Sequence, residues 1–423
     1  MDPPWSKRPQ KPPTGKKRGG QPGHSGAYRP LQPESAVDHR VICTPTECRH
    51  CGTSFGAGRS RRRKVRRFQV VELPPIRPEI TEYQVEGRSC RCCGRRTWGT
   101  LPAGVTRCVG PRVQAIAALF SGACRLPRRQ TQSVLADLFG VRLSLGALSA
   151  LEGDTAQALA VPYTELAETL PRAPVLGIDE TSWKEGGTLH WIWTAVTPGF
   201  AFFHVDRHRS RAAFEALLPP STAAHDGPVV TSDRYSAYNH LPAQRRSLCW
   251  AHLARDFRAV EERGGVDAVV GRWMLEVFGK ILEPWHRHHR GDLTRDELRR
   301  EISERQEELR VPLRWGEASG SPKTQALCRD LRERWTSLWT WAAVEGGEPT
   351  NNRAERALRP AVLWRKSSFG HQSETGEQFV ERMLTAVTTL RLQGRNVWRY
   401  LVESCEAGRL NNAAPSLLPQ APR

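Results

Sequence analysis

Three acidic residues stand beside short stretches that predict regular structure. Asp179 follows the apolar run at 175–178, Asp233 follows a similar run at 229–232, and Glu355 lies in a segment that predicts a helix. Short runs rich in β-branched residues predict buried strands, and ligands of open α/β sheets gather at the carboxyl ends of strands. Carboxylates so placed suit two Mg²⁺ (or Mn²⁺) ions about 3.5–4 Å apart, which can activate an attacking oxygen and stabilise a leaving one in phosphodiester chemistry.

The same positions allow structural interpretations. Asp233 can simply open a turn into Arg234, and Glu355 stands three residues after Asn352, which is the spacing of a capping box. The helix of Glu355 is expected to be short, because Pro360 limits or kinks it. Spacing alone therefore leaves both interpretations open.

The elements that would position these acids form a predicted core that begins near Pro174. Strands are expected at 175–179, 189–196, 201–205, 229–233 and 247–250, with a helix at 211–218. About 120 residues separate Asp233 from Glu355, which is too many for a loop. Much of that interval is helical in pattern, and Thr294 with Glu297 forms a capping box. We therefore expect an all-helical insertion that interrupts the core.

Two Cys-x-x-Cys-Gly segments near the N-terminus predict a structural zinc site. Their four cysteines are Cys48, Cys51, Cys90 and Cys93. Thiolates at this spacing grip a tetrahedral Zn²⁺, and the glycine permits the tight turn. The competing ligands are Cys43, His50 and Cys92. Residues 66–72 and 80–85 predict two strands, so a zinc ribbon is favoured over free thiols in a small β module.

Composition points to a polyanion as the partner. The 423 residues include 63 Lys and Arg against 44 Asp and Glu, a formal net charge of +19. Such an excess favours salt-sensitive association with nucleic acid. The Pro-, Gly- and Lys-rich N-terminus predicts a flexible basic arm, with a solvated tail as the alternative. The basic patch between the cysteine segments, which is expected to meet the DNA backbone, comprises Arg61, Arg62, Arg63 and Lys64.

Other classes of protein are disfavoured. No stretch approaches the roughly 18 consecutive apolar residues of a membrane span, and no apolar signal region follows the first charges. Eleven cysteines, largely clustered, favour metal binding and reduced thiols over a secreted disulfide framework. We expect a cytoplasmic, nucleoid-associated protein.

A helix-turn-helix is predicted between the cysteine segments and the core. A helix over 126–140 ends at Gly140, and Ser144 can cap the helix that follows. The second helix would enter a major groove, with Arg128 and Arg129 as DNA contacts. Simple helical packing between the zinc module and the core is the alternative.

Several ordered motifs resemble the transposases of the IS66 insertion-sequence family. The matching segments are LGIDETSW at 176–183, HWIW at 190–193, SDRYSAY at 232–238, CWAHLARDF at 249–257 and NNRAERALRP at 351–360. Further matches are Gly20–His24 near the N-terminus and Arg365, Lys366, Gly370, Ser373 and Gly376 near the C-terminus. The resemblance runs to about residue 405.

The resemblance implies that Asp179, Asp233 and Glu355 are the DDE triad of an RNase H-like core. It also implies a DNA transposase that binds the inverted repeats of its element as double-stranded DNA, cleaves them and transfers strands into target DNA. A homo-oligomer on DNA and accessory proteins from the same element are expected. The alternatives are a catalytically inactive DNA-binding regulator derived from a transposase, and a nuclease acting on RNA in hybrids.

The expected architecture is a multidomain α/β protein. Its parts are an arm (1–40), a zinc module (41–110), a helical segment (111–168), the two halves of the core (169–260 and 345–408) around the insertion (261–344), and a loose tail (409–423).

Further side chains near the triad are candidates for a role in the chemistry. Cationic residues after the glutamate are expected to hold phosphates, and these are Arg356, Arg359, Arg365 and Lys366. Cys249 and His252 form a Cys-x-x-His pair that either braces the core or binds metal. Four tryptophans are candidates for base stacking, with core packing as the alternative, and these are Trp183, Trp191, Trp193 and Trp364.

Overall fold

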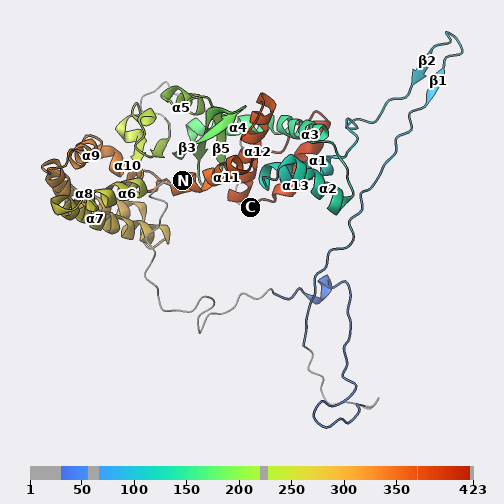
Figure 1. Cartoon of the computed structure of the whole chain (residues 1–423), viewed down its shortest axis with the longest axis horizontal. Coiled ribbons are helices and arrows are strands. Elements are labelled where there is room, and N and C mark those ends of the chain that lie inside the picture. The colour runs from blue at the N-terminus through green and yellow to red at the C-terminus, as the bar shows by residue number, and fades with distance from the viewer. Residues whose placement is uncertain (1–29, 56–65, 220–226, 369, 420–423) are drawn as a thin grey trace. The chain divides into compact units, whose positions relative to one another are not determined.

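The computed structural model describes residues 30–55, 66–219, 227–368 and 370–419 (Figure 1). The chain forms two compact units, Met1–Ile76 and Arg77–Arg423. Among the described residues, no helix combines the length and apolar character that crossing a bilayer requires.

The region that carries the cysteines is mostly extended. Its described elements are the 3-10 helix η2 (Glu34–Ala36) in the first unit and the antiparallel pair β1 (Gly87–Ser89) and β2 (Arg96–Trp98) in the second. The prediction of strands at 66–72 and 80–85 was wrong. Phe68 and Ile80 are 90% and 88% exposed, so no layer covers the side chains that favoured a strand there.

A group of helices precedes the sheet. It comprises α1 (Pro111–Ala118), the π-helical turn η3 (Leu119–Ala123), α2 (Arg128–Phe139), α3 (Leu145–Ala158), α4 (Ala160–Thr169) and the 3-10 turn η4 (Leu170–Arg172). Gly140 ends α2 with φ 65°, and the Ser144 hydroxyl accepts the Ala147 N–H, as predicted. Helix α3 packs against α1 and against α12 (Glu374–Leu392) and α13 (Val397–Arg409). This agrees with the packing interpretation, and major-groove binding by α3 remains a prediction.

The core is a five-stranded mixed sheet in the order β5-β4-β3-β6-β7. Its strands are β3 (Val175–Glu185), β4 (Thr188–Val196), β5 (Ala201–Asp206), β6 (Val229–Ser232) and β7 (Arg246–Leu248), with α5 (Arg211–Leu217) and the 3-10 turns η5 (Ser236–Tyr238) and η6 (Ala243–Arg245) between them. All five expected strands and the helix are present. The first strand is longer than predicted, because its second half pairs with β4 in an antiparallel hairpin.

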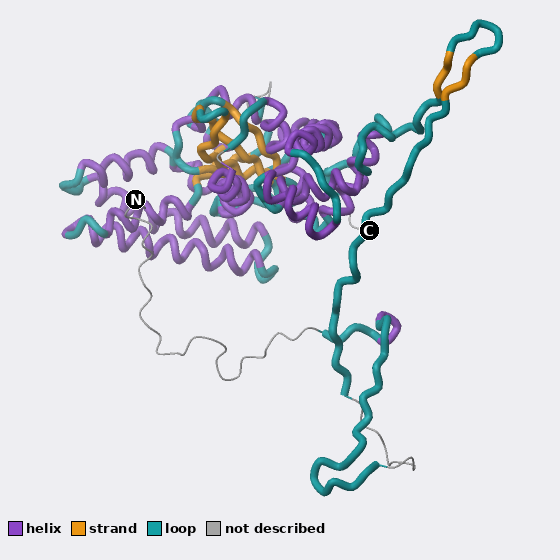
Figure 2. Tube along the Cα trace, turned by 45° about the vertical axis from the view of Figure 1, so that its right-hand side comes forward, coloured by secondary structure: helices purple, strands orange, loops and turns teal. Residues whose placement is uncertain are grey.

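Residues 250–343 form helices, which agrees with the helical pattern expected for 261–344 (Figure 2). This stretch contains α6 (Trp250–Glu261), α7 (Gly265–His289), α8 (Arg295–Glu317), α9 (Pro322–Glu333) and α10 (Trp335–Ala343). Thr294 and Glu297 form the predicted capping box at the start of α8. These helices bury their own apolar cluster, which is distinct from the cluster between the sheet and the remaining helices.

Two predictions about the C-terminal part were wrong. Helix α11 (Asn352–Ser368) continues through Pro360 to Ser368 instead of ending near the proline. The described part of the tail, up to residue 419, is docked, because Leu417 is 1% exposed and its carbonyl accepts the Gln393 amide at 2.8 Å. The Tyr400 hydroxyl also donates to the Pro415 carbonyl at 2.7 Å, so the tail completes the apolar surface of α13.

Candidate active site

The register of two parallel strands sets the first two acids beside each other. Gly177 in β3 pairs with Thr231 in β6. Asp179 stands two residues after Gly177 within β3, and Asp233 stands two residues after Thr231, directly past the end of β6. Neighbouring strands lie about 4.8 Å apart, so this register places the two acids near each other. Asp179 lies in mid-strand and not at the strand end that the sequence predicted, because β3 continues to Glu185.

A chain of hydrogen bonds ties the start of α11 to this edge. The Asn351 side-chain amide donates to the Ile178 carbonyl at 2.7 Å, and the Asn351 carbonyl accepts the Glu355 N–H at 3.1 Å. The Cys249 sulfur accepts the Asn351 N–H at 3.1 Å, and the Cys249 N–H donates to the Ser232 carbonyl at 2.9 Å. The residues just before Asp179 and Asp233 are thereby linked to the helix that carries the third acid.

Gly177 leaves room for this link. A β-carbon at Gly177 would lie 2.7 Å from the Asn351 side-chain oxygen and 3.4 Å from the Ala354 β-carbon. Asn351 is itself 2% exposed. The glycine is therefore required here for close approach of the helix to the strand.

The three acids share one electrostatic environment. The pKa of Asp179 is raised to about 7, first by burial and then by the negative charges of Glu180, Glu355 and Asp233. Repulsion from Glu355 and from Asp233 contributes to this pKa shift. The carboxylates of both residues therefore lie close enough to Asp179 to interact with its charge. The result is a cluster of acidic side chains, partly offset by Arg209 and Arg255, whose remaining negative charge a divalent cation would neutralise.

Each acid also has contacts within the protein. Asp233 accepts the Tyr235 N–H at 2.9 Å, so it opens a turn as well as facing the candidate site. Glu355 lies in the first turn of α11, and its carboxylate contacts Arg255 at 3.2 Å and His252 at 3.7 Å. Among the described residues, Glu355 makes no capping bond to the backbone of Asn352, because Asn352 is already the first helical residue.

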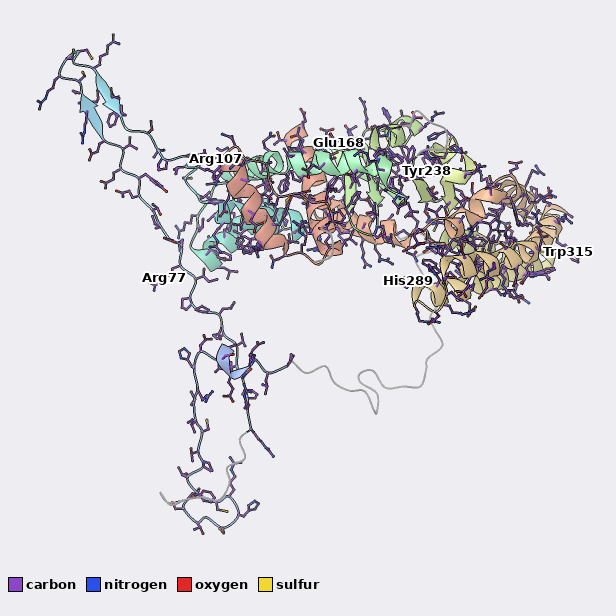
Figure 3. The ribbon with its side chains drawn as sticks, turned by 180° about the vertical axis from the view of Figure 1, so that it is seen from behind. Arg77, Arg107, Glu168, Tyr238, His289 and Trp315 are labelled. Atoms are coloured by element: carbon purple, nitrogen blue, oxygen red, sulfur yellow. The ribbon has the colours of Figure 1, made fainter. Side chains whose placement is uncertain are left out.

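Sequence reasoning missed a second layer of polar residues. Arg209 pairs with the buried Glu180 at 2.6 Å, and its terminal nitrogen lies 3.9 Å from the Asp233 carboxylate. The Tyr238 hydroxyl, which comes from the turn η5 and is labelled in Figure 3, donates to the other carboxylate oxygen of Glu180. The Arg209 guanidinium also stacks 3.8 Å from the Tyr235 ring centroid. Adjacency to Asp179 could have identified Glu180, but no pattern in the sequence links Arg209 to it.

The residues predicted to contact DNA differ in their surroundings in the structure. Arg61, Arg62, Arg63 and Lys64 lie outside the described residues. Arg128 pairs with Glu152 at 2.6 Å, and Arg365 donates to the Thr181 hydroxyl at 3.1 Å and to Ser182. The remaining predicted contacts are exposed, and these are Arg129, Arg356, Arg359 and Lys366.

The two cysteine segments have the same local backbone structure. The Gly52 N–H donates to the Cys48 carbonyl at 2.9 Å, and the Gly94 N–H donates to the Cys90 carbonyl at 2.9 Å. Both glycines are left-handed, with φ of 72° and 69°. Hydrogen bonds lower the pKa of Cys51, chiefly from Thr53, and of Cys90, chiefly from the Cys93 backbone. Each segment thus has the tight backbone turn that the zinc-site prediction requires.

A second cluster of possible ligands is less suited to a cation. Glu185, His371 and Glu377 lie together, but the Trp183 indole N–H donates to Nδ1 of His371 at 2.8 Å. With Nδ1 as the acceptor, the neutral ring carries its proton on Nε2, so Nε2 faces the carboxylates as a donor without a free lone pair. Trp183, Trp193 and Trp364 are buried, so core packing is correct for all three.

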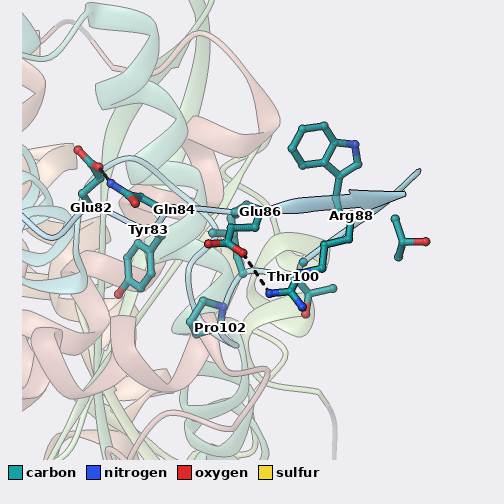
Figure 4. Close-up of a pocket in the computed structure, with 12 residues that line it drawn as sticks. Glu82, Tyr83, Gln84, Glu86, Arg88, Thr100 and Pro102 are labelled. Carbon is teal, nitrogen blue, oxygen red and sulfur yellow. Dashed lines mark hydrogen bonds and ion pairs between the residues drawn. The ribbon is translucent and has the colours of Figure 1, made fainter. Parts of the chain in front are cut away.

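A surface hollow lies elsewhere in the second unit (Figure 4). Its volume is about 740 Å³, and its lining comes entirely from residues between Glu82 and Pro102, including Tyr83 and Trp98. It contains none of the acids described above.

Comparison with known proteins identifies relatives. The family model described as "Transposase IS66 family" matches residues 108–378. The chain is also 29% identical over 189 residues to the uncharacterized protein y4qI of Sinorhizobium fredii, a match that covers 39% of this chain and 33% of that protein. The chain therefore spans about a third of the length of this curated relative.

Proposed function

Since the chain belongs to the IS66 family of transposases, we propose that it binds the terminal inverted repeats of an insertion sequence and catalyses metal-dependent cleavage and transfer of DNA strands. The earlier resemblance is thereby confirmed at the level of the family. The sheet order β5-β4-β3-β6-β7, interrupted by helices, supports an RNase H-like core.

One observation carries the catalytic proposal. Burial, together with repulsion from Glu180, from Glu355 in α11 and from Asp233 just after β6, raises the pKa of Asp179 in β3 to about 7. Asp233 and Glu355 are half-buried and contact Arg209 and Arg255, whereas Asp179 forms no ion pair with a cationic side chain among the described residues. The charge of Asp179 therefore carries a desolvation cost that a metal ion would offset. Asp179, Asp233 and Glu355 are oxygen donors of the type that Mg²⁺ or Mn²⁺ prefers.

The protein's own groups have distinct roles in this proposal. The triad would hold the ions, which when bound supply activation of the attacking oxygen and stabilisation of the leaving oxygen. Arg255, with a side chain 59% exposed, lies beside Glu355 and is free at its outer face to contact a DNA phosphate. Arg209 and Tyr238 hold Glu180, which fixes the strand segment at Asp179.

The N-terminal region would recognise the element ends. We propose a structural Zn²⁺ held by Cys48, Cys51, Cys90 and Cys93, with basic residues around it following the DNA backbone. A homo-oligomer on paired ends and accessory proteins from the same element complete the proposal.

The test compares wild type with Asp179→Asn. We expect Mg²⁺-dependent nicking of element ends by the wild type, a loss of at least about 1000-fold in the variant, and unchanged end binding in a gel shift. Asp296→Asn, at an exposed position on α8, is the matched control and should nick normally. If Asp179→Asn nicks as fast as the control, the triad is wrong. If wild type binds ends without nicking under any divalent metal, the chain is an inactive regulator.

A further inference from the structure

A second set of metal-ligand atoms lies against the proposed triad. The Cys249 sulfur, the His252 Nδ1 and a Glu355 carboxylate oxygen all lie within 4.8 Å of one another. Cys249 and His252 flank the first residues of α6, whereas Glu355 comes from α11. Glu355 thus belongs to two ligand sets, one made only of oxygens and one that mixes sulfur, nitrogen and oxygen.

The sulfur and the nitrogen are both shielded from water. Cys249 is 1% exposed and is the N-cap residue of α6. Burial raises the pKa of its thiol, and the backbone N–H groups of Asn351, His252 and Ala251 oppose this shift, so a bound cation would displace the proton and hold the sulfur as a thiolate. The Asn351 N–H already points at its sulfur from 3.1 Å. The His252 Nδ1 is shielded from solvent and has no hydrogen-bond partner. A buried polar atom without a hydrogen-bond partner lowers the stability of the folded protein by about 1–3 kcal/mol. A cation bound to the His252 Nδ1 would remove this cost.

We propose that Cys249, His252 and Glu355 bind a thiophilic divalent cation such as Zn²⁺, and that this cation inhibits DNA cleavage by withdrawing Glu355 from the catalytic ions. The inhibition rests on the proposed function, but the binding does not.

The chemistry of the ligands decides the identity of the ion. Thiolate and imidazole select Zn²⁺, Co²⁺ or Cd²⁺ over Mg²⁺, which prefers oxygen. Tetrahedral Zn²⁺ needs bonds of about 2.0–2.3 Å, which small movements of these three side chains supply. Arg255 now contacts Glu355 at 3.2 Å, but its side chain is 59% exposed and can turn into solvent when a cation takes its place. Water fills the fourth position.

Binding is tested with Co²⁺ as the probe, because a cobalt–thiolate bond absorbs in the near ultraviolet. The full-length protein is first loaded with one equivalent of Zn²⁺ to fill the N-terminal cysteines. We expect a cobalt–thiolate band in wild type that is lost in Cys249→Ser and weakened in His252→Gln. Cys328→Ser, which alters an equally buried thiol in α9, is the matched control and keeps the band. An unchanged band in folded Cys249→Ser, or in His252→Gln should the serine variant not fold, overturns the site.

Inhibition is tested separately. Zn²⁺ should inhibit Mg²⁺-dependent nicking, and the concentration for half inhibition should rise at least about tenfold in Cys249→Ser, when each variant is compared with its own rate without Zn²⁺. Equal sensitivity of wild type and Cys249→Ser refutes the inhibitory role. A cobalt band in a protein that never nicks DNA upholds the site and refutes the catalytic proposal, so the two failures are distinguishable.

Discussion

The cysteine segments and the carboxylate cluster differ in the distance along the chain over which their geometry is fixed. Each cysteine segment is shaped by hydrogen bonds within six residues, such as that from Cys48 N–H to Thr53. The carboxylates come from β3, from the residue that follows β6 and from α11, and their approach depends on a strand register and on the contacts of Asn351.

This difference has an energetic consequence. A local turn forms with little loss of chain entropy, and the proposed metal ion would stabilise it further. The carboxylate cluster is held against its own repulsion by the packing of the whole second unit. Metal binding by the cysteine segments should therefore be sensitive to the loss of a single cysteine. The position and charge of the three carboxylates should be sensitive to changes in packing and in pH.

The largest effect should come from the cysteines. Cys51→Ser and Cys90→Ser should each weaken Zn²⁺ binding by about 1000-fold or more, because loss of one thiolate opens the tetrahedral site. Metal content and chelator competition measure this effect. If the two cysteine segments share one Zn²⁺ ion, either variant should release that ion. Retention of a full equivalent by either variant would show that His50, Cys43 or Cys92 completes a separate site.

Asp179→Asn should stabilise the metal-free protein. The folded pKa of Asp179 is about 7, above the unfolded value of about 3.9. The folded state thus binds more protons between these values, so the acid's contribution to stability is present below about pH 4 and is lost as pH rises to 7. At pH 8 without Mg²⁺, removing this charge should raise the free energy of unfolding by roughly 2–4 kcal/mol.

Denaturant unfolding at pH 5 and pH 8 measures this gain. The difference in the free energy of unfolding between Asp179→Asn and wild type should be smaller at pH 5. It should disappear with saturating Mg²⁺, because Mg²⁺ stabilises only the wild type. Destabilisation of the variant at pH 8 would contradict the repulsion inferred here.

Gly177→Ala should disrupt the contact between β3 and Asn351 at the start of α11. The new methyl group would meet the Asn351 oxygen and displace α11 together with Glu355. We expect nicking to fall about 30-fold at unchanged DNA affinity, because small displacements of catalytic groups are costly. Gly279→Ala in α7, where nothing lies within 4 Å, is the control. Normal nicking by a folded Gly177→Ala would show that the spacing of helix and strand is not critical.

The smallest effect should come from the insertion. Arg234, next to Asp233, pairs with Asp330 of α9 at 2.7 Å and with Asp256 of α6 at 2.8 Å. Asp330→Asn leaves the second pair intact, so we expect nicking to fall only about threefold. Steady-state nicking rates of wild type and Asp330→Asn on one element end would measure this fall. A loss as large as that of Gly177→Ala would show that the insertion itself sets the position of Asp233.

Much of the core could be predicted because its patterns are local. Alternating and apolar runs located β3 to β7, and the cap at Thr294 located α8. The same rules failed at 66–72 and 80–85, where strand-forming side chains have no layer to cover them. They also failed at the C-terminal tail, where a contact with α13 orders residues that look loose in sequence.

The sequence by itself determined the family, the acidic residues, the strands that carry two of them and the cysteine segments, because each depends on residue types a few positions apart. Only the tertiary structure decided that Asn351 and Gly177 bring α11 to the middle of β3, beside the end of β6. It alone also decided that Arg209 supports Glu180 and that Cys249 and His252 share Glu355. These contacts join residues tens to more than a hundred positions apart, and their geometry follows from the packing of the folded chain.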